Sequence, residues 1–154
     1  MNNLYHCMQC DIPISKGIHD FSHEVYGVPL CIHHQILIYE SMASQEAKAL
    51  FLALKINKVP AVLEYSDGFK TVDIAIPGRL YIEVDEDQNR DADQALTDLL
   101  RTYHSWSKER IPTVRIPNAL INNPYLFKKA VSCLSEMCLF VEGSPGRDRI
   151  ALAS

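Results

Sequence analysis

Apolar side chains recur along the chain with two different periods, which separates expected helices from expected strands. Spacings of three and four residues predict amphipathic helices, whereas alternating apolar runs bounded by Gly, Pro or Asp predict strands. The expected elements, in chain order, are a helix over 35–57, strands over 62–65, 69–76 and 79–85, a helix over 91–108, a strand over 112–118 and a helix over 124–137. Ser44 is a suitable N-cap residue inside the first helical region, where we expect a break. Strands followed by a strand–helix–strand unit predict an α/β fold with a mixed sheet and helices on both faces.

The composition is that of a globular protein. The 154 residues suit one domain, or one domain with a small module, and 47% apolar with 22% charged residues excludes wholesale disorder. No segment approaches the roughly 18 apolar residues of a membrane span. The start, MNNLYHCMQC, has neither the basic residues nor the apolar block of a secretory signal, so we expect a cytoplasmic protein.

Charge and metal-ligating residues are unevenly distributed. Residues 1–34 hold five of the six histidines and three of the five cysteines. Residues 83–98 carry seven acids and one base, whereas residues 101–129 carry six bases and one acid. The net charge of −4 argues against a generic nucleic-acid coat but leaves room for a local basic face. These shifts predict three parts: a zinc-binding module with a linker helix over 1–43, a second domain over 44–142 and a flexible tail over 143–154.

Two pairs of metal ligands with the same internal spacing lie in the first part. Cys7-x2-Cys10 is followed, after 20 residues, by Cys31-x2-His34. Four thiolate and imidazole ligands are typical of a closed, structural Zn²⁺ site, and we expect each pair to lie at a tight turn. His33 is an alternative to His34, although the x2 spacing favours His34. Because so short a segment buries little apolar surface, the metal is expected to supply its folding energy.

Three acids are expected to meet at the end of two neighbouring strands. Asp73 lies within the otherwise apolar run Val72-Asp73-Ile74-Ala75-Ile76. Glu83 and Asp85 are two residues apart, so they emerge on the same face of the next strand. Carboxylates that converge repel one another unless a cation lies among them, and oxygen ligands suit Mg²⁺ or Mn²⁺. The alternative is that these acids form the solvent face of an alternating strand.

The order of these segments resembles the PD-(D/E)XK nuclease superfamily, in particular its small branch similar to very-short-patch-repair endonucleases. The resemblance covers roughly residues 44–138. It rests on Glu46 in the first helix, the hairpin, T-V-D-I-A-I over 71–76, R-L-Y-I-E-V-D over 79–85, Asp98-Leu99-Leu100-Arg101 on a helix, and V-R-I-P-N over 114–118. The Cys/His head resembles the zinc ribbons that some such proteins carry in front.

The resemblance implies a restriction-endonuclease-like fold, ordered α-β-β-β-α-β-α, and a metal-dependent DNA endonuclease. Asp73, Glu83 and the backbone carbonyl of Val84 are then expected to hold a catalytic Mg²⁺ or Mn²⁺, with Glu46 reaching the ion directly or through water. The metal polarises the scissile phosphodiester and activates a water for in-line hydrolysis. Asp85 is a candidate for a further ligand, and, where the family pattern has a lysine or histidine that this chain lacks, Gln88 is a candidate to orient the water and Lys70 or Arg101 to supply the positive charge. Arg101, Lys70 and Arg115 are expected to contact DNA.

This chain departs from the family pattern at the catalytic strand. Asp85 stands where the superfamily often has lysine, and Glu86 and Asn89 stand where the small branch often has glycine and histidine. Two hypotheses therefore stay open: an active endonuclease, or a catalytically weak or inactive nuclease-like module that binds nucleic acid or a protein partner. The oligomeric state is left open, with a homodimer among the alternatives.

Overall fold

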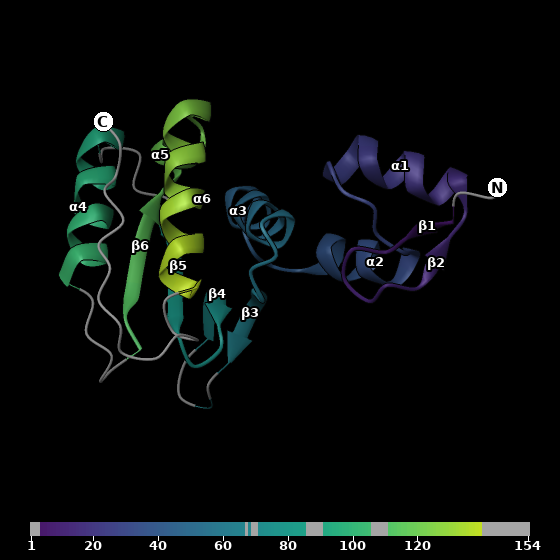
Figure 1. Cartoon of the computed structure of the whole chain (residues 1–154), viewed down its shortest axis with the longest axis horizontal. Helices are drawn as coiled ribbons and strands as arrows, with labels where there is room; N and C mark the ends of the chain where they lie inside the picture. Colours follow the sequence, from purple (N-terminus) through teal and green to yellow (C-terminus); the bar gives the residue numbers. More distant parts are fainter. Residues whose placement is uncertain (1–3, 67, 69–70, 86–90, 106–110, 140–154) are drawn as a thin grey trace.

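The computed structural model describes residues 4–66, 68, 71–85, 91–105 and 111–139, and the side chains of residues 98, 100–105 and 139 lie outside that description. The described helices and strands are β1 (Tyr5–His6), β2 (Pro13–Ile14), α1 (Lys16–Tyr26), α2 (Ile32–Glu40), α3 (Gln45–Ile56), β3 (Val62–Ser66), β4 (Thr71–Ile76), β5 (Leu80–Asp85), α4 (Ala92–Ser105), β6 (Thr113–Pro117), α5 (Asn118–Ile121) and α6 (Pro124–Leu139). Figure 1 shows a small N-terminal module of β1, β2, α1 and α2 beside a larger domain that starts at α3.

The N-terminal module is a short hairpin followed by two helices. β1 pairs antiparallel with β2. α1, which the sequence pattern did not predict, begins at Ser15, whose side chain accepts a hydrogen bond from the amide of Ile18. It ends at Gly27, whose φ of 74° is the left-handed conformation that glycine adopts at little cost.

The predicted break in the helical region 35–57 is confirmed. α2 ends at Glu40, and α3 starts after Ser44, whose side chain accepts a hydrogen bond from the amide of Ala47 at 3.1 Å. α2 begins at Ile32, earlier than predicted, so the second pair of metal ligands lies at the start of a helix.

The larger domain contains a four-stranded mixed sheet, as the strand pattern predicted. The strand order is β3-β4-β5-β6; β3, β4 and β5 are antiparallel, and β6 runs parallel to β5 after the α4 crossover. The four predicted strands and the two predicted later helices are all present, with bounds that differ by a few residues. α5 was not predicted.

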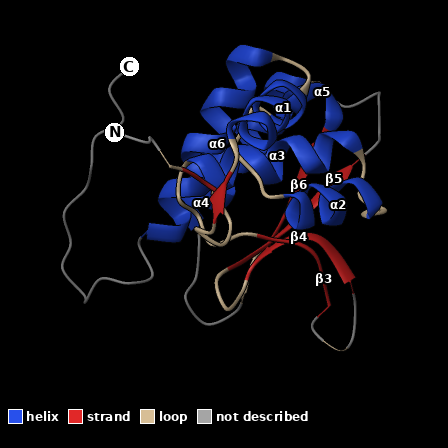
Figure 2. Cartoon of the chain, turned by 90° about the vertical axis from the view of Figure 1, so that its right-hand side faces the viewer, coloured by secondary structure: helices blue, strands red, loops and turns tan. Residues whose placement is uncertain are grey.

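The helices of this domain contact one another, which differs from the expectation of helices on both faces of the sheet. α6 contacts α3, α4 and α5, and these mutual contacts place the four helices in one layer. Figure 2 shows the helices gathered above the strands. The order of elements is compatible with either arrangement, and the apolar face of α6 selects this one by packing against both α3 and α4.

The core lies between this helical layer and one face of the sheet. The strand side chains turned toward it are almost completely buried: Ile74, Ile76, Leu80, Ile82, Val114 and Ile116. The opposite face is more open, and Asp73, Tyr81 and Glu83 are half-buried there. Within the described residues, no helix combines the length and apolar character needed to cross a bilayer.

Candidate functional site

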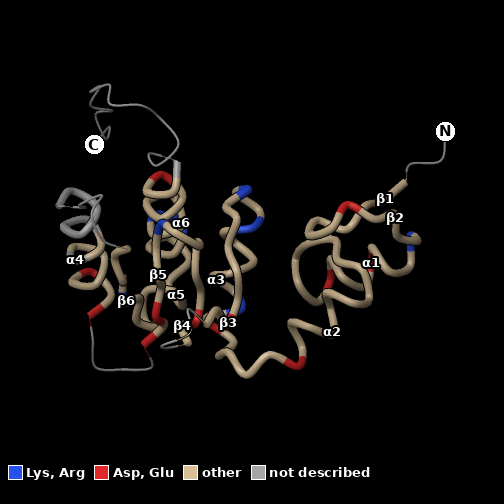
Figure 3. Tube along the Cα trace, turned by 90° about the horizontal axis from the view of Figure 1, so that it is seen from below, with Lys and Arg blue, Asp and Glu red and all other residues tan. Residues whose placement is uncertain are grey.

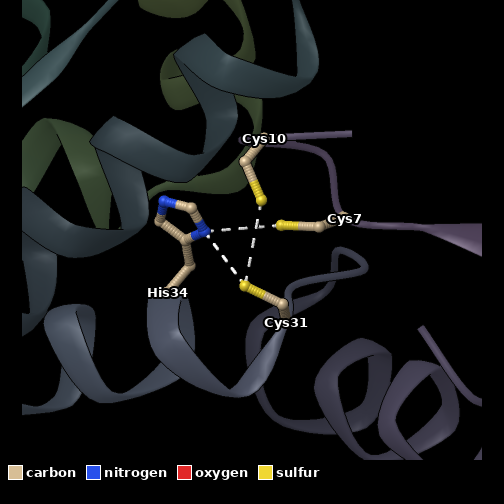
Figure 4. Close-up of side chains that lie close together, drawn as sticks. All are labelled: Cys7, Cys10, Cys31 and His34. Carbon is tan, nitrogen blue, oxygen red and sulfur yellow. Dashed lines mark hydrogen bonds between the residues drawn. The ribbon is translucent and has the colours of Figure 1, made fainter. Parts of the chain in front are cut away.

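Three cysteines and one histidine converge in the N-terminal module. One ligand atom from each of Cys7, Cys10, Cys31 and His34 lies within 4.8 Å of the others (Figure 4). The Sγ atoms of Cys7 and Cys31 lie 3.5 and 3.2 Å from His34 Nδ1, and Cys10 Sγ lies 4.0 Å from Cys31 Sγ. A tetrahedron with Zn–S and Zn–N bonds of normal length has edges of about 3.8 Å between sulfurs and about 3.6 Å between sulfur and nitrogen. The cluster therefore has the size and the donor set that a zinc ion fits.

The first ligand pair lies on the turn that joins β1 to β2. Its backbone is closed by two hydrogen bonds, from the Cys7 amide to the Ile12 carbonyl and from the Asp11 amide to the Cys7 carbonyl. Asp11 has a φ of 58°, a left-handed conformation that Asp tolerates better than most residues. This tight turn, which the sequence predicted, directs both thiols to the same side.

The second ligand pair lies at a helix N-terminus, so the expectation of a second tight turn is wrong. Cys31 is the N-cap residue of α2, and His34 lies in the first turn. Residues three apart on a helix lie on the same side, which lets one thiol and one imidazole face the first pair. The helix N-terminus also carries a partial positive charge that stabilises thiolates.

Local hydrogen bonds change the pKa values of the first two thiols. Burial raises the pKa of the Cys7 thiol, but hydrogen bonds from the backbone at Cys31, Cys10 and Gln9 outweigh it, and the pKa lies below the usual value. For Cys10 the backbone hydrogen bond at Ile12 lowers the pKa, whereas desolvation and the neighbouring thiols raise it above the usual value. Three thiols this close favour a bound cation, because they cannot all ionise without one.

His34, and not His33, faces the thiols. Its Nδ1 atom is the nitrogen within reach of Cys7 and Cys31. The pKa of His34 is lowered, mainly by burial and then by the charges of His33 and Lys55, and the neutral imidazole is the form that binds a metal. His33 is exposed, and its ring packs edge-on against His34.

The candidate acidic site lies where β4 and β5 separate. Backbone pairing of these strands ends at Ile74 and Ile82. Beyond that point the amide of Val84 donates a hydrogen bond of 2.7 Å to Asp73 Oδ2, so a side chain replaces the next strand contact. The Asp73 carboxylate thus lies beside the Glu83–Val84 peptide. Asp85 lies on the same strand face as Glu83, and both are half-buried.

The structure describes only some of the other residues predicted for this site. Glu46, in the first turn of α3, has its Oε1 atom 3.5 Å from the Asn122 side-chain nitrogen, a long contact. Arg115 is exposed on β6, where it is the register partner of Glu83. Gln88, Lys70 and the side chain of Arg101 lie outside the described residues.

The acids do not form a metal-sized group like that of the thiols. In the part of the chain that the structure describes, the Cys/His cluster is the one set of three or more His, Cys, Asp or Glu ligands gathered this closely. Figure 3 shows acidic positions on the same side of the domain, where β4, β5 and the start of α4 come together. The arrangement therefore brings Asp73 to the backbone of Glu83 and Val84, whereas the side chain of Glu46 makes a long contact with Asn122.

Two polar residues near these sites were not singled out from the sequence. Glu64 on β3 bonds to the segment between α2 and α3, and its φ of 51° is unusual for a non-glycine residue. Asn118 follows Pro117, the register partner of Asp85, and its buried Oδ1 atom has no hydrogen-bond partner among the described residues. Glu64 belongs to no spaced motif, and Asn118 ends the V-R-I-P-N segment over 114–118, where the sequence assigned the asparagine no role of its own.

Comparison of the chain with protein-family models, with curated proteins and with solved structures finds no match.

Proposed function

We propose that the chain is a metal-dependent DNA endonuclease of the PD-(D/E)XK type that carries a structural zinc module. The observation that supports this most directly is the 2.7 Å hydrogen bond from the Val84 amide to Asp73. It brings the carboxylate of one strand to the Glu83–Val84 peptide of the next. That is where the family resemblance expects two carboxylates and a carbonyl to hold the catalytic cation.

The element order supports the same proposal. One helix, three antiparallel strands, a crossover helix and a parallel fourth strand follow one another from α3 to β6. The resemblance expects this order in a restriction-endonuclease-like domain, with its acids on the second and third strands. Asp73 on β4 and Glu83 on β5 occupy those strands.

In this proposal Asp73, Glu83 and the Val84 carbonyl would hold Mg²⁺ or Mn²⁺. When bound, the ion polarises the phosphodiester and lowers the pKa of the attacking water. Hydrolysis leaves a 5′-phosphate and a 3′-hydroxyl. Asp85 is proposed as an additional ligand and Glu46 as a ligand through water. Gln88 is proposed to orient the water, and Arg101, Lys70 and Arg115 to bind DNA phosphates.

A second candidate is a nuclease-like module that binds DNA or a protein partner without cutting DNA. Two observations favour it. Asp85 stands where the superfamily often has the lysine that assists the water. In addition, the described acids form no three-ligand group of the kind that the thiols form.

The test compares DNA cleavage in Mg²⁺ or Mn²⁺ by the parent protein and by Asp73→Asn and Glu83→Gln. Asp73→Asn keeps an oxygen that accepts the Val84 amide but removes the charge that attracts a cation. Glu24→Gln, which changes an exposed acid of α1, is the matched control for charge. Calorimetric titration with Mn²⁺ measures cation binding in each variant.

We expect cleavage by the parent and by Glu24→Gln, and a loss of at least 100-fold in both site variants, because each variant removes a charge that would hold the catalytic cation. Cleavage that persists in both site variants would contradict the proposed site. DNA binding without cleavage under either cation would support the second candidate instead.

A further inference from the structure

The segment that joins the zinc module to the larger domain is fastened to β3 by one side chain. Glu64 Oε2 accepts hydrogen bonds from the Ser41 hydroxyl at 2.9 Å and from the Met42 amide at 3.2 Å. The Ser41 hydroxyl oxygen in turn accepts the amide of Ala43 at 3.1 Å. A single carboxylate therefore accepts hydrogen bonds from two successive residues of the connection between α2 and α3.

Glu64 adopts an unfavourable backbone conformation. Its φ of 51°, in the middle of a strand, is one that β-strand residues with a Cβ atom avoid. Residues held in such conformations persist only where surrounding contacts hold them, and they mark functional sites. The bonds to Ser41 and Met42 are contacts of this kind.

Glu64 also lies opposite Asp73 in the sheet. The register pairs Leu63 with Ile74 and Tyr65 with Val72, so these two pairs flank Glu64 and Asp73 on both sides. On its other side, Asp73 accepts the amide of Val84. A change in the backbone at Glu64 can therefore affect the candidate acidic site directly, through the pairing of β3 with β4.

The zinc site is close to the same junction. His34 and Glu64 line one cavity of about 420 Å³, together with residues of α2, α3 and β3. Ser41, which bonds to Glu64, directly follows α2, the helix whose N-cap residue and first turn supply Cys31 and His34. The folded state of α2 therefore decides whether the partners of Glu64 are held in place.

We propose that Glu64 couples the zinc module to the Asp73 end of the sheet, so that zinc binding holds the Asp73–Val84 contact in place. Loss of the metal loosens α2 and releases Ser41 and Met42 from Glu64. The left-handed residue then relaxes, and the strand end around Asp73 and Val84 opens more often. This coupling goes beyond the proposed nuclease activity and does not depend on it.

The test measures amide hydrogen exchange by NMR in the full chain, with zinc and after chelation. The reporters are the amides of Met42 and Val84, and the amide of Ile74 in the core reports unfolding of the whole sheet. The variants are Glu64→Gly, which suits the positive φ but removes the carboxylate, and Glu64→Gln, which keeps an acceptor oxygen. Glu40→Gln, at the exposed end of α2, is the control for charge. Zinc content is measured for every sample.

We expect chelation to speed exchange at Met42 and Val84 at least tenfold in the parent and in Glu40→Gln, with Ile74 unchanged. Zinc-loaded Glu64→Gly should already exchange fast at both amides and respond less than twofold to chelation. Glu64→Gln should behave as the parent. The proposal is overturned if chelation does not change the exchange rate of the Val84 amide in the parent. It is also overturned if chelation speeds Val84 exchange in Glu64→Gly as much as in the parent.

Discussion

Removing zinc is expected to unfold the N-terminal module while the larger domain stays folded. Four aliphatic side chains of the module are almost fully buried: Ile14, Val28, Leu30 and Ile38. At about 1.5–3 kcal/mol each, their burial contributes roughly 6–12 kcal/mol. Structural zinc bound by cysteine and histidine typically contributes about 10–16 kcal/mol near neutral pH. The metal therefore contributes at least as much stabilising free energy as the burial of these four side chains.

The assay is a chelator titration followed by NMR and circular dichroism. The amide signals of α1 and α2 should collapse into the narrow range of an unfolded chain, with a loss of helical signal that readded zinc restores. The signals of α3, β4 and α6 should stay dispersed, because α3 contacts both β4 and α6. A metal-free chain in which the α1 amides keep their native positions would refute the reasoning, because apolar packing would then suffice without the metal.

Four further results are expected. His34→Ala should lower zinc affinity at least 100-fold, whereas His33→Ala should change it less than threefold, as measured by competition with a chromogenic chelator. Alkylation of the metal-free chain at pH 8, without denaturant, should modify the three cysteine ligands quickly, whereas Cys133 and Cys138, whose burial raises the pKa of each thiol to about 11, should react only after denaturation. Because these two thiols ionise more readily in the unfolded chain, near the ordinary thiol pKa of 9.0, the free energy of unfolding in urea should fall as the pH rises from 9 toward 11. Ser44→Ala should lower the free energy of unfolding by about 1 kcal/mol, because α3 loses its N-cap hydrogen bond.

The sheet and the zinc ligands follow from sequence because their signals are local. Alternation of apolar and polar residues, with turns at Pro77-Gly78, specifies β3, β4 and β5. Two ligands separated by two residues can reach the same metal ion from a single turn of backbone, so their spacing is visible in the sequence. For the same reason the preference for His34 over His33 agrees with the geometry.

Features that depend on burial or on distant contacts were missed. In α1 the apolar residues at helical spacing do not mark the buried side: Phe21 and Val25 are exposed, whereas Ser22 is fully buried and its hydroxyl bonds to the backbone of Val28 and Leu30. The positive φ of Glu64 has no sequence signal, since glycine or asparagine is the usual residue for that conformation. The single helical layer was missed because contacts of α6, and not the order of elements, determine it.

The most direct test of the central claim is zinc analysis combined with X-ray absorption at the zinc edge on the purified chain. The four converging side chains predict one zinc per chain, with three sulfur ligands at about 2.3 Å and one nitrogen ligand at about 2.0 Å. Cys10→Ser should lose the tightly bound metal, whereas Cys138→Ser should keep it. A chain that binds no zinc, or binds it with only oxygen and nitrogen ligands, would contradict the account.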